Sequence, residues 1–150
     1  MEVLVNAGRA DGHEFAFQRP RRSMRPRVIV LDDQKYLRDI IAAVVEDAGY
    51  PSLAVATAEE ALQRLDEFHS ELLVLDMSLP GTSGLAFLEQ LRADSAWRQL
   101  PVVMVSGDPG RLVGVEGRAD VVALTKPFDV SALVAAIERL LGPPALTHSA

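Results

Sequence analysis

The feature that most constrains this chain is a regular alternation of short apolar runs with helix-like patterns. The apolar runs lie at residues 28–31, 53–56, 72–75, 101–105 and 121–124, and helical patterns separate them. Short runs of this kind are typical of strands buried on both faces of a sheet. Strands that alternate with helices form parallel βαβ units with right-handed crossovers. The alternation therefore predicts an α/β fold, a doubly wound five-stranded parallel sheet with helices on both faces in a three-layer sandwich.

Between these runs, apolar residues recur at spacings of three and four, as one buried face of a helix requires. We expect the first helix to bury Leu37, Ile40, Ile41, Val44, Val45 and Ala48, and the last to bury Val130, Leu133, Val134, Ile137, Leu140 and Leu141. Thr57 and Glu60 have the spacing of a capping box at the start of the second helix. Asp129 is placed to cap the last helix.

Composition excludes several function classes. The chain has no cysteine, which removes disulfides, cysteine zinc sites and thiol nucleophiles. Its net charge of −6 argues against a general nucleic-acid binder. Its apolar runs, such as residues 102–105, are too short to span a membrane, and the N-terminus lacks the pattern of a secretory signal. We therefore expect a cytoplasmic protein.

The charge is distributed unevenly along the chain. Residues 1–27 carry a balance of +3, so the remainder must carry −9 to give the total of −6. We expect residues 1–25 to be a flexible basic arm, residues 26–142 to be the folded domain and residues 143–150 to be a disordered tail. The arm has three interpretations, namely a contact for an anionic partner, a solvated tail, or an extension upstream of a native start at Met24.

Chemically reactive side chains stand where the predicted strands end. Asp32 and Asp33 follow the first strand, Asp76 ends the third, and Ser106 and Lys126 follow the fourth and fifth. In open sheets of this kind the ligand site lies beyond the carboxyl ends of the strands. Clustered carboxylates repel one another unless a cation lies among them, and oxygen ligands of this kind suit Mg²⁺. An aspartate carboxylate can become an aspartyl phosphate. Together with a lysine and a hydroxyl, it indicates phosphoryl transfer to a carboxylate.

These same segments resemble a known family. Residues 28–33, 73–84, 101–106 and 124–128 are similar, in order and spacing, to the receiver domain of two-component response regulators. The resemblance covers about residues 27–141. It implies the flavodoxin-like strand order 2-1-3-4-5, a cis peptide bond between Lys126 and Pro127, and a role in signalling rather than enzymatic turnover.

The resemblance also implies a role for each site residue. Asp76 is the expected phosphoacceptor, which takes its phosphoryl group from a sensor histidine kinase or a phosphotransfer protein. Asp32, Asp33 and Asp76 are expected to hold Mg²⁺, with the Ser78 position contributing through its backbone or a water. Ser78 also stands where the family tunes self-catalysed dephosphorylation. Lys126 is expected to pair with Asp76 and then with the phosphoryl group.

Switching in the family is expected to involve Ser106, which turns to bind a phosphoryl oxygen. Two departures bear on this switch. Ala123 stands where the family usually has an aromatic residue on the fifth strand. Residues 109–118 contain three glycines, each of which disfavours a helix by about 1 kcal/mol relative to alanine. We therefore expect a fourth helix that is short, shifted or partly melted, and a switch by an order–disorder change over residues 107–120.

The lead hypothesis is a stand-alone receiver that signals through a conformational change near the fourth strand and helix. Its expected partners are a kinase or phosphotransfer protein and an unnamed downstream protein, with no membrane or nucleic acid, and a monomer or weak dimer is expected. One alternative is a receiver-like interaction module that is not phosphorylated. Another is an Asp-nucleophile phosphatase of the haloacid dehalogenase type. Ser78 stands where that class has a second aspartate and counts against it.

Overall fold

The computed structural model describes residues 25–115 and 117–142. In chain order the elements are β1 (Arg27–Leu31), α1 (Lys35–Asp47), β2 (Ser52–Val55), α2 (Ala58–Glu67), β3 (Ser70–Asp76), β4 (Ser78–Leu79), β5 (Thr82–Ser83), α3 (Gly84–Ala93), β6 (Val102–Ser106), α4 (Pro109–Leu112), β7 (Val121–Thr125) and α5 (Val130–Leu141). The expected arm and tail lie outside the described residues, apart from Arg25.

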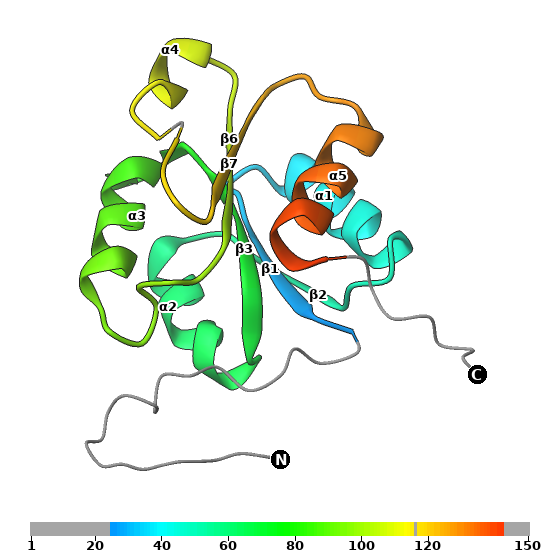
Figure 1. Ribbon diagram of the computed structural model, residues 1–150, viewed down its shortest axis with the longest axis horizontal. Coiled ribbons are helices and arrows are strands. Elements are labelled where there is room, and N and C mark those ends of the chain that lie inside the picture. Colours follow the sequence, from blue (N-terminus) through cyan, green and yellow to red (C-terminus); the bar gives the residue numbers. More distant parts are fainter. Residues whose placement is uncertain (1–24, 116, 143–150) are drawn as a thin grey trace.

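Five parallel strands form the central sheet in the order β2-β1-β3-β6-β7 (Figure 1). Because β6 and β7 are the fourth and fifth strands of this sheet, the predicted order 2-1-3-4-5 is confirmed. The central position of β3 places Val74 between Val30 of β1 and Val103 of β6. All five carboxyl ends therefore meet at one edge of the sheet.

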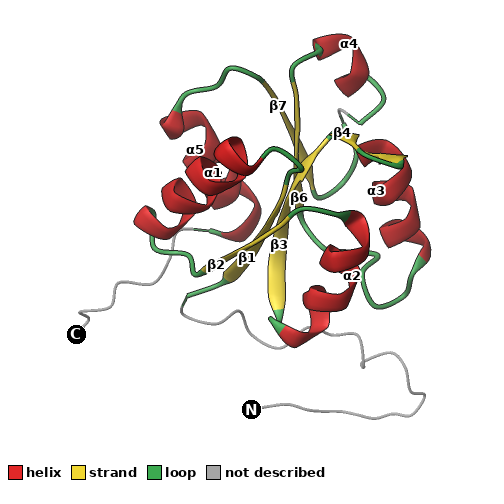
Figure 2. Cartoon of the chain, turned by 180° about the vertical axis from the view of Figure 1, so that it is seen from behind, coloured by secondary structure: helices red, strands yellow, loops and turns green. Residues whose placement is uncertain are grey.

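Two apolar cores lie on the two faces of the sheet. Successive strand residues point to opposite faces. Val28 and Val30 accordingly belong to the core beneath α1 and α5, whereas Ile29 and Leu31 belong to the core beneath α2 and α3. Figure 2 shows these helix pairs on either side of the strands. The three-layer arrangement predicted from the alternation is therefore confirmed.

The helix caps agree only in part with the sequence. The Thr57 hydroxyl accepts a 3.1 Å hydrogen bond from the Glu60 N–H, and the Glu60 carboxylate accepts one from the Ala56 N–H. The predicted cap of α2 is thus present. Asp129 occupies the N-cap position of α5, but its side chain makes no capping hydrogen bond there. Asp129 is therefore the N-cap residue that the sequence indicated, but without a side-chain hydrogen bond.

Two apolar side chains expected in the core are exposed. Ile40 of α1 is 42% exposed and Val130 of α5 is 60% exposed. The helical spacing marks a broad apolar face, and the sheet covers only part of its width. Both residues line a groove between α1 and α5, whereas Ile41, which also lines it, is buried. Their assignment to the buried side was therefore wrong.

The segments near the carboxyl edge depart from regular structure. The loop after β3 contains β4 and β5, two strands of two residues that pair antiparallel. The helix α4 has four residues, which agrees with the short fourth helix expected from its glycines. The Lys126–Pro127 peptide bond is cis, as the resemblance implied. Among the described residues, no helix is long and apolar enough to cross a membrane.

Candidate functional site

Three carboxylates gather at the carboxyl edge of β1 and β3. Leu31 lies opposite Leu75 in the parallel register, so the residues that follow, Asp32 and Asp76, emerge side by side. Asp32 is 2% exposed and Asp76 is 6% exposed, whereas Asp33 is open to solvent. One carboxylate oxygen from each of the three lies within 4.8 Å of the others. The sheet thus brings together the acidic residues named from the sequence.

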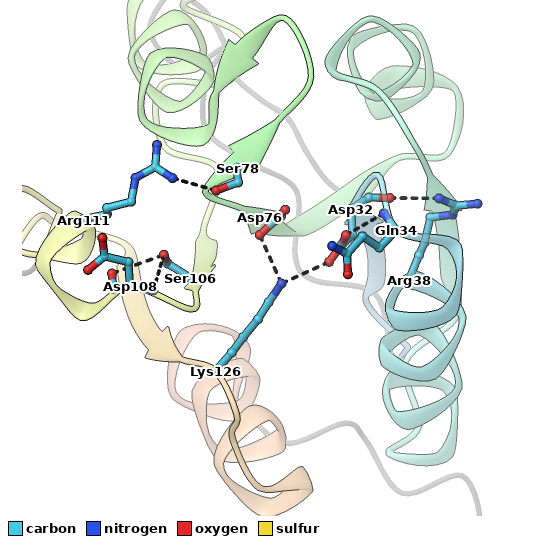
Figure 3. A network of polar contacts seen from close by, with 9 residues as sticks. All are labelled: Asp32, Gln34, Arg38, Asp76, Ser78, Ser106, Asp108, Arg111 and Lys126. Carbon is cyan, nitrogen blue, oxygen red and sulfur yellow. Dashed lines mark hydrogen bonds and ion pairs between the residues drawn. The ribbon is translucent and has the colours of Figure 1, made fainter.

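Lys126 carries positive charge into this acidic cluster. Its ammonium nitrogen Nζ lies 3.3 Å from Oδ1 of Asp76 and 3.6 Å from Oδ2 of Asp32 (Figure 3). Lys126 follows β7, and its backbone N–H donates to the carbonyl of Ser106. The lysine side chain therefore crosses from the far edge of the sheet to the acids that follow β1 and β3.

The protonation of Asp76 reflects opposing influences. Burial raises the pKa of the Asp76 carboxyl above its ordinary value, and the nearby Asp32 charge raises it further. The Lys126 ammonium and the backbone N–H of Ser78 act in the opposite direction. Positive charge at this edge of the sheet therefore favours the ionised form of Asp76.

The loop between β1 and α1 is held in place by its own hydrogen bonds. Oδ1 of Asp32 accepts a 2.9 Å hydrogen bond from the Gln34 N–H. The guanidinium of Arg38 donates to the Asp32 carbonyl at 3.0 Å. One oxygen of the Asp32 carboxylate thus belongs to the turn, and the other faces Lys126. Sequence reasoning did not identify Arg38, because an arginine in the first turns of a helix carries no local signal for this contact.

Ser106 is at the expected edge, but its hydroxyl does not bond to Asp76. The Ser106 side chain is buried and accepts a 3.0 Å hydrogen bond from the Asp108 N–H. It also donates to the Asp108 carbonyl at 3.2 Å. Figure 3 shows this pair beside α4, while Lys126 points to Asp76 and Asp32. The hydroxyl expected to bind a phosphoryl group is therefore engaged within its own loop.

Ser78 makes a contact that sequence reasoning missed. Its hydroxyl accepts a 2.7 Å hydrogen bond from the Arg111 guanidinium, which comes from α4 (Figure 3). The neighbouring Met77 carbonyl accepts the Gly84 N–H. Nothing in the local pattern around Arg111 shows that it faces the strand that follows Asp76. Only the position of α4 above β4 reveals the contact.

The donor set fits a magnesium ion. Mg²⁺ prefers oxygen ligands and usually takes a few carboxylates together with waters and phosphate oxygens. Three carboxylate oxygens within 4.8 Å of one another match this preference, and one of the carboxylates is open to solvent. The ion pairs to Lys126 compensate part of the negative charge. Asp32, Asp33 and Asp76 are therefore the residues that would hold such an ion.

A doubly wound five-stranded sheet with acids and a lysine at its carboxyl edge defines the class of CheY-like receiver folds. The family model described as "Response regulator receiver domain" matches residues 28–138. The chain belongs to this family, and is a receiver domain of two-component signalling.

Individual relatives agree with this assignment. The Phosphate regulon transcriptional regulatory protein PhoB of Escherichia coli (strain K12) is 33% identical, over 79% of this chain and 52% of that protein. A sensor protein from Polaromonas sp. JS666 has a TM-score of 0.72 and 26% identity, and covers 81% of this chain and 99% of its own. A CheY-like receiver domain from Methylobacillus flagellatus has a TM-score of 0.66 and 25% identity, with coverage of 77% and 98%.

The curated relatives are longer than the matched region. The chain spans about half the length of the curated relatives it matches, which include proteins named as a transcriptional regulatory protein and as a DNA-binding response regulator. The hypothesis of a stand-alone receiver therefore stays a prediction. So does the expectation that nucleic acid is not a partner.

Proposed function

We propose that Asp76 is the phosphoacceptor of this receiver domain. Its donor would be the phosphohistidine of a sensor histidine kinase or of a phosphotransfer protein. The observation that carries the proposal is the ion pair of Lys126 with Asp76 inside a cluster of three carboxylates. Asp76 is a buried carboxylate that lies beside the Lys126 ammonium and within a candidate metal site. Such a carboxylate is suited to accept a phosphoryl group. The domain responsible is proposed to span residues 26–142.

The proposed transfer needs few chemical groups. A carboxylate oxygen of Asp76 attacks phosphorus, the new P–O bond forms and the P–N bond of the donor breaks. The electron pair of that bond stays on the imidazole of the donor. Transition states of this kind are loose, and catalysis rests on positioning and on neutralisation of charge. Lys126, whose Nζ is 3.3 Å from Asp76, is placed to donate to a phosphoryl oxygen.

Asp32 and Asp33 would hold Mg²⁺ together with Asp76. When bound, the ion would neutralise negative charge on the carboxylates and on the phosphoryl oxygens. The turn that fixes Asp32, through the Gln34 N–H and the Arg38 guanidinium, would keep its carboxylate directed into the site. Asp33 is exposed and stands at the solvent side of the cluster.

Signalling would follow from a movement of Ser106. A phosphoryl oxygen is a stronger acceptor than the Asp108 carbonyl, because hydrogen bonds to charged groups are the stronger ones. If Ser106 turns to the phosphoryl group, the Asp108 N–H loses its partner, and the Asp108 carbonyl keeps only its hydrogen bond from the Arg111 N–H. Asp108 precedes α4 and caps it through a hydrogen bond to the Gly110 N–H. The change at Asp76 would thereby reach the β6–α4 region.

A small phosphodonor provides the test. With Mg²⁺ and acetyl phosphate, the protein should gain the mass of one phosphoryl group. Asp76→Asn should abolish the gain because the amide lacks the nucleophilic oxygen, whereas the exposed Asp47→Asn should retain it. Intact-protein mass spectrometry measures both outcomes.

Three other outcomes would reject this proposal. The absence of any mass gain in the wild-type protein would favour the interaction module that is not phosphorylated. Rapid turnover of many donor molecules per protein would favour the phosphatase. A gain that persists in Asp76→Asn would place the acceptor elsewhere.

A further inference from the structure

Two hydroxyl groups beside Asp76 are both engaged by the same short segment. The Ser106 hydroxyl binds the backbone of Asp108, and the Ser78 hydroxyl binds the guanidinium of Arg111 at 2.7 Å. Within the segment, the Arg111 N–H donates to the Asp108 carbonyl at 3.0 Å. One chain of hydrogen bonds therefore runs from Ser106 through Asp108 and Arg111 to Ser78 (Figure 3).

Ser78 lies close to the position that a phosphoryl group on Asp76 would occupy. Its backbone N–H bonds to the Asp76 carboxylate and lowers the pKa of that group. Its side chain is exposed, so the Arg111 guanidinium bonded to it lies at the solvent-facing side of the site. This is the side from which a donor or an attacking water must approach, because the opposite side of Asp76 is packed into the sheet.

We propose that Arg111 is a phosphoryl-binding residue carried on α4. When Asp76 is phosphorylated, the guanidinium turns from the Ser78 hydroxyl to a phosphoryl oxygen, and the start of α4 moves with it. The inference rests on the proposed phosphorylation of Asp76. Arg111 would be a second positively charged side chain, besides Lys126, that binds the phosphoryl group. It would also be the residue through which α4 responds to phosphorylation.

Charge and hydrogen bonding both favour this exchange. A guanidinium presents five N–H donors in a fork that matches phosphate oxygens, and charge-assisted hydrogen bonds exceed those to a neutral hydroxyl. Within the described residues, the Arg111 side chain has a single hydrogen bond, the one to Ser78. The loss of the bond between Ser106 and Asp108 would also release the carbonyl that holds the Arg111 N–H.

Arg118 lies in the same irregular stretch and serves as a contrast. Its guanidinium forms a 2.6 Å ion pair with Glu89 of α3 and donates to the Gly114 carbonyl at 3.2 Å. It is thus anchored to α3, away from Asp76. Arg118→Ala is therefore a matched control, because it removes the same charge from the same segment.

This role would also account for the alanine at position 123. The family usually couples its switch to an aromatic residue there, and Ala123 of β7 has no side chain able to change rotamer. An arginine that follows the phosphoryl group would couple the site to α4 directly. Four helical residues are few enough to move with one side chain.

The lifetime of the phosphorylated protein tests the proposal. In hydrolysis, a water oxygen attacks phosphorus, the P–O bond to Asp76 breaks, and inorganic phosphate leaves while the carboxylate retains the electron pair. A guanidinium that covers the phosphoryl group would exclude the attacking water from the phosphorus. After removal of acetyl phosphate in the presence of Mg²⁺, Arg111→Ala should lose its phosphoryl group about three to ten times faster than the wild-type protein. Arg111→Lys should retain part of the lifetime, and Arg118→Ala should match the wild-type protein.

A second measurement distinguishes phosphoryl binding from a general loosening of α4. Hydrogen exchange over residues 107–115 should change on phosphorylation in the wild-type protein and in Arg118→Ala, but much less in Arg111→Ala. Equal lifetimes in Arg111→Ala and Arg118→Ala would overturn the proposal, as would an unaltered exchange response in Arg111→Ala. A wild-type protein that gains no phosphoryl mass would instead reject the function of Asp76 itself, so the two failures are distinguishable.

Discussion

At the scale of single residues, Asp76 combines burial with the need to be ionised. Burial and the Asp32 charge raise the pKa of Asp76, yet only its ionised form can attack phosphorus. The Lys126 ammonium acts against this rise from 3.3 Å away. Lys126 therefore has two consecutive tasks in the proposed function, first to keep the nucleophile ionised and then to bind the group it has accepted.

Tyr50 is a buried ionisable residue far from this site. Its hydroxyl donates a 3.2 Å hydrogen bond to the carbonyl of Gly142, just after α5. Burial, with a smaller contribution from the charge of Glu138, raises the pKa of Tyr50 from 10.0 to about 12. The folded protein therefore favours the neutral phenol at pH values at which the unfolded chain has already lost this proton.

This pKa shift predicts a loss of stability at alkaline pH. Below pH 10 the phenol is neutral in both states, and the stabilisation is fully present. As the pH rises from 10.0 to about 12, the unfolded chain ionises first, so the free energy of unfolding falls. Tyr50→Phe should lack this part of the decline. Urea unfolding of both proteins at neutral pH and between pH 10 and 12 measures the difference, and parallel pH profiles would contradict the prediction.

At the scale of elements, α3 begins unusually close to Asp76, the proposed phosphoacceptor. The Gly84 N–H donates to the Met77 carbonyl at 2.6 Å. A Cβ atom at position 84 would lie 2.5 Å from the Asp76 carbonyl oxygen and 2.7 Å from the Met77 Cα. Both are backbone atoms, so the clash could not be relieved by a side-chain rotation. Only glycine allows α3 to begin at this distance from the end of β3.

Gly84→Ala should therefore destabilise the protein and displace Asp76. Forcing one extra carbon into a packed backbone contact usually costs about 1–3 kcal/mol in the free energy of unfolding. We also expect slower phosphorylation by acetyl phosphate, because the backbone that carries Asp76 must shift. Gly114→Ala is the matched control, since a Cβ there meets no atom within 4 Å. Chemical denaturation and the rate of mass gain test the two effects, and equal behaviour of both variants would refute the argument.

The elements also show which features could be predicted from the sequence. The convergence of Asp32, Asp76 and Lys126 follows from strand direction alone, because parallel strands bring their carboxyl ends to one edge. The cap at Thr57 is a local interaction and could also be predicted from the sequence. The exposure of Val130 could not be predicted, because periodicity identifies an apolar face without showing which part of it the sheet covers. The contact of Arg111 with Ser78 depends on how an irregular segment packs, which no local pattern encodes.

At the scale of the whole molecule, an apolar groove adjoins the candidate site. It lies between α1 and α5 and is lined mainly by apolar side chains, together with Lys126 and Pro127. Ile40 and Val130 line it and are 42% and 60% exposed. A protein donor must bring its phosphohistidine to Asp76, so it must cover the surface beside Lys126. The groove is therefore the surface on which we expect the phosphohistidine-bearing partner to dock.

Charged substitutions in the groove should separate the two kinds of donor. Ile40→Asp and Val130→Asp should slow phosphorylation by a phosphohistidine-bearing protein about tenfold or more, because they place an uncompensated charge in an apolar contact. Phosphorylation by acetyl phosphate should be unchanged. Val113→Asp, at a side chain that is 68% exposed after α4, is the control and should affect neither rate. An equal loss with both donors would indicate damage to the site rather than to docking.

The parallel arrangement of the sheet has a further consequence for the folding equilibrium. The acids and the lysine are contributed by positions from 32 to 126, and only Asp32 and Asp33 are neighbours in the unfolded chain. A cation that binds the assembled carboxylates has no comparable site in the unfolded state, so by mass action it favours the folded protein. The concentration of free magnesium would thus act on the abundance of native protein as well as on its signalling chemistry.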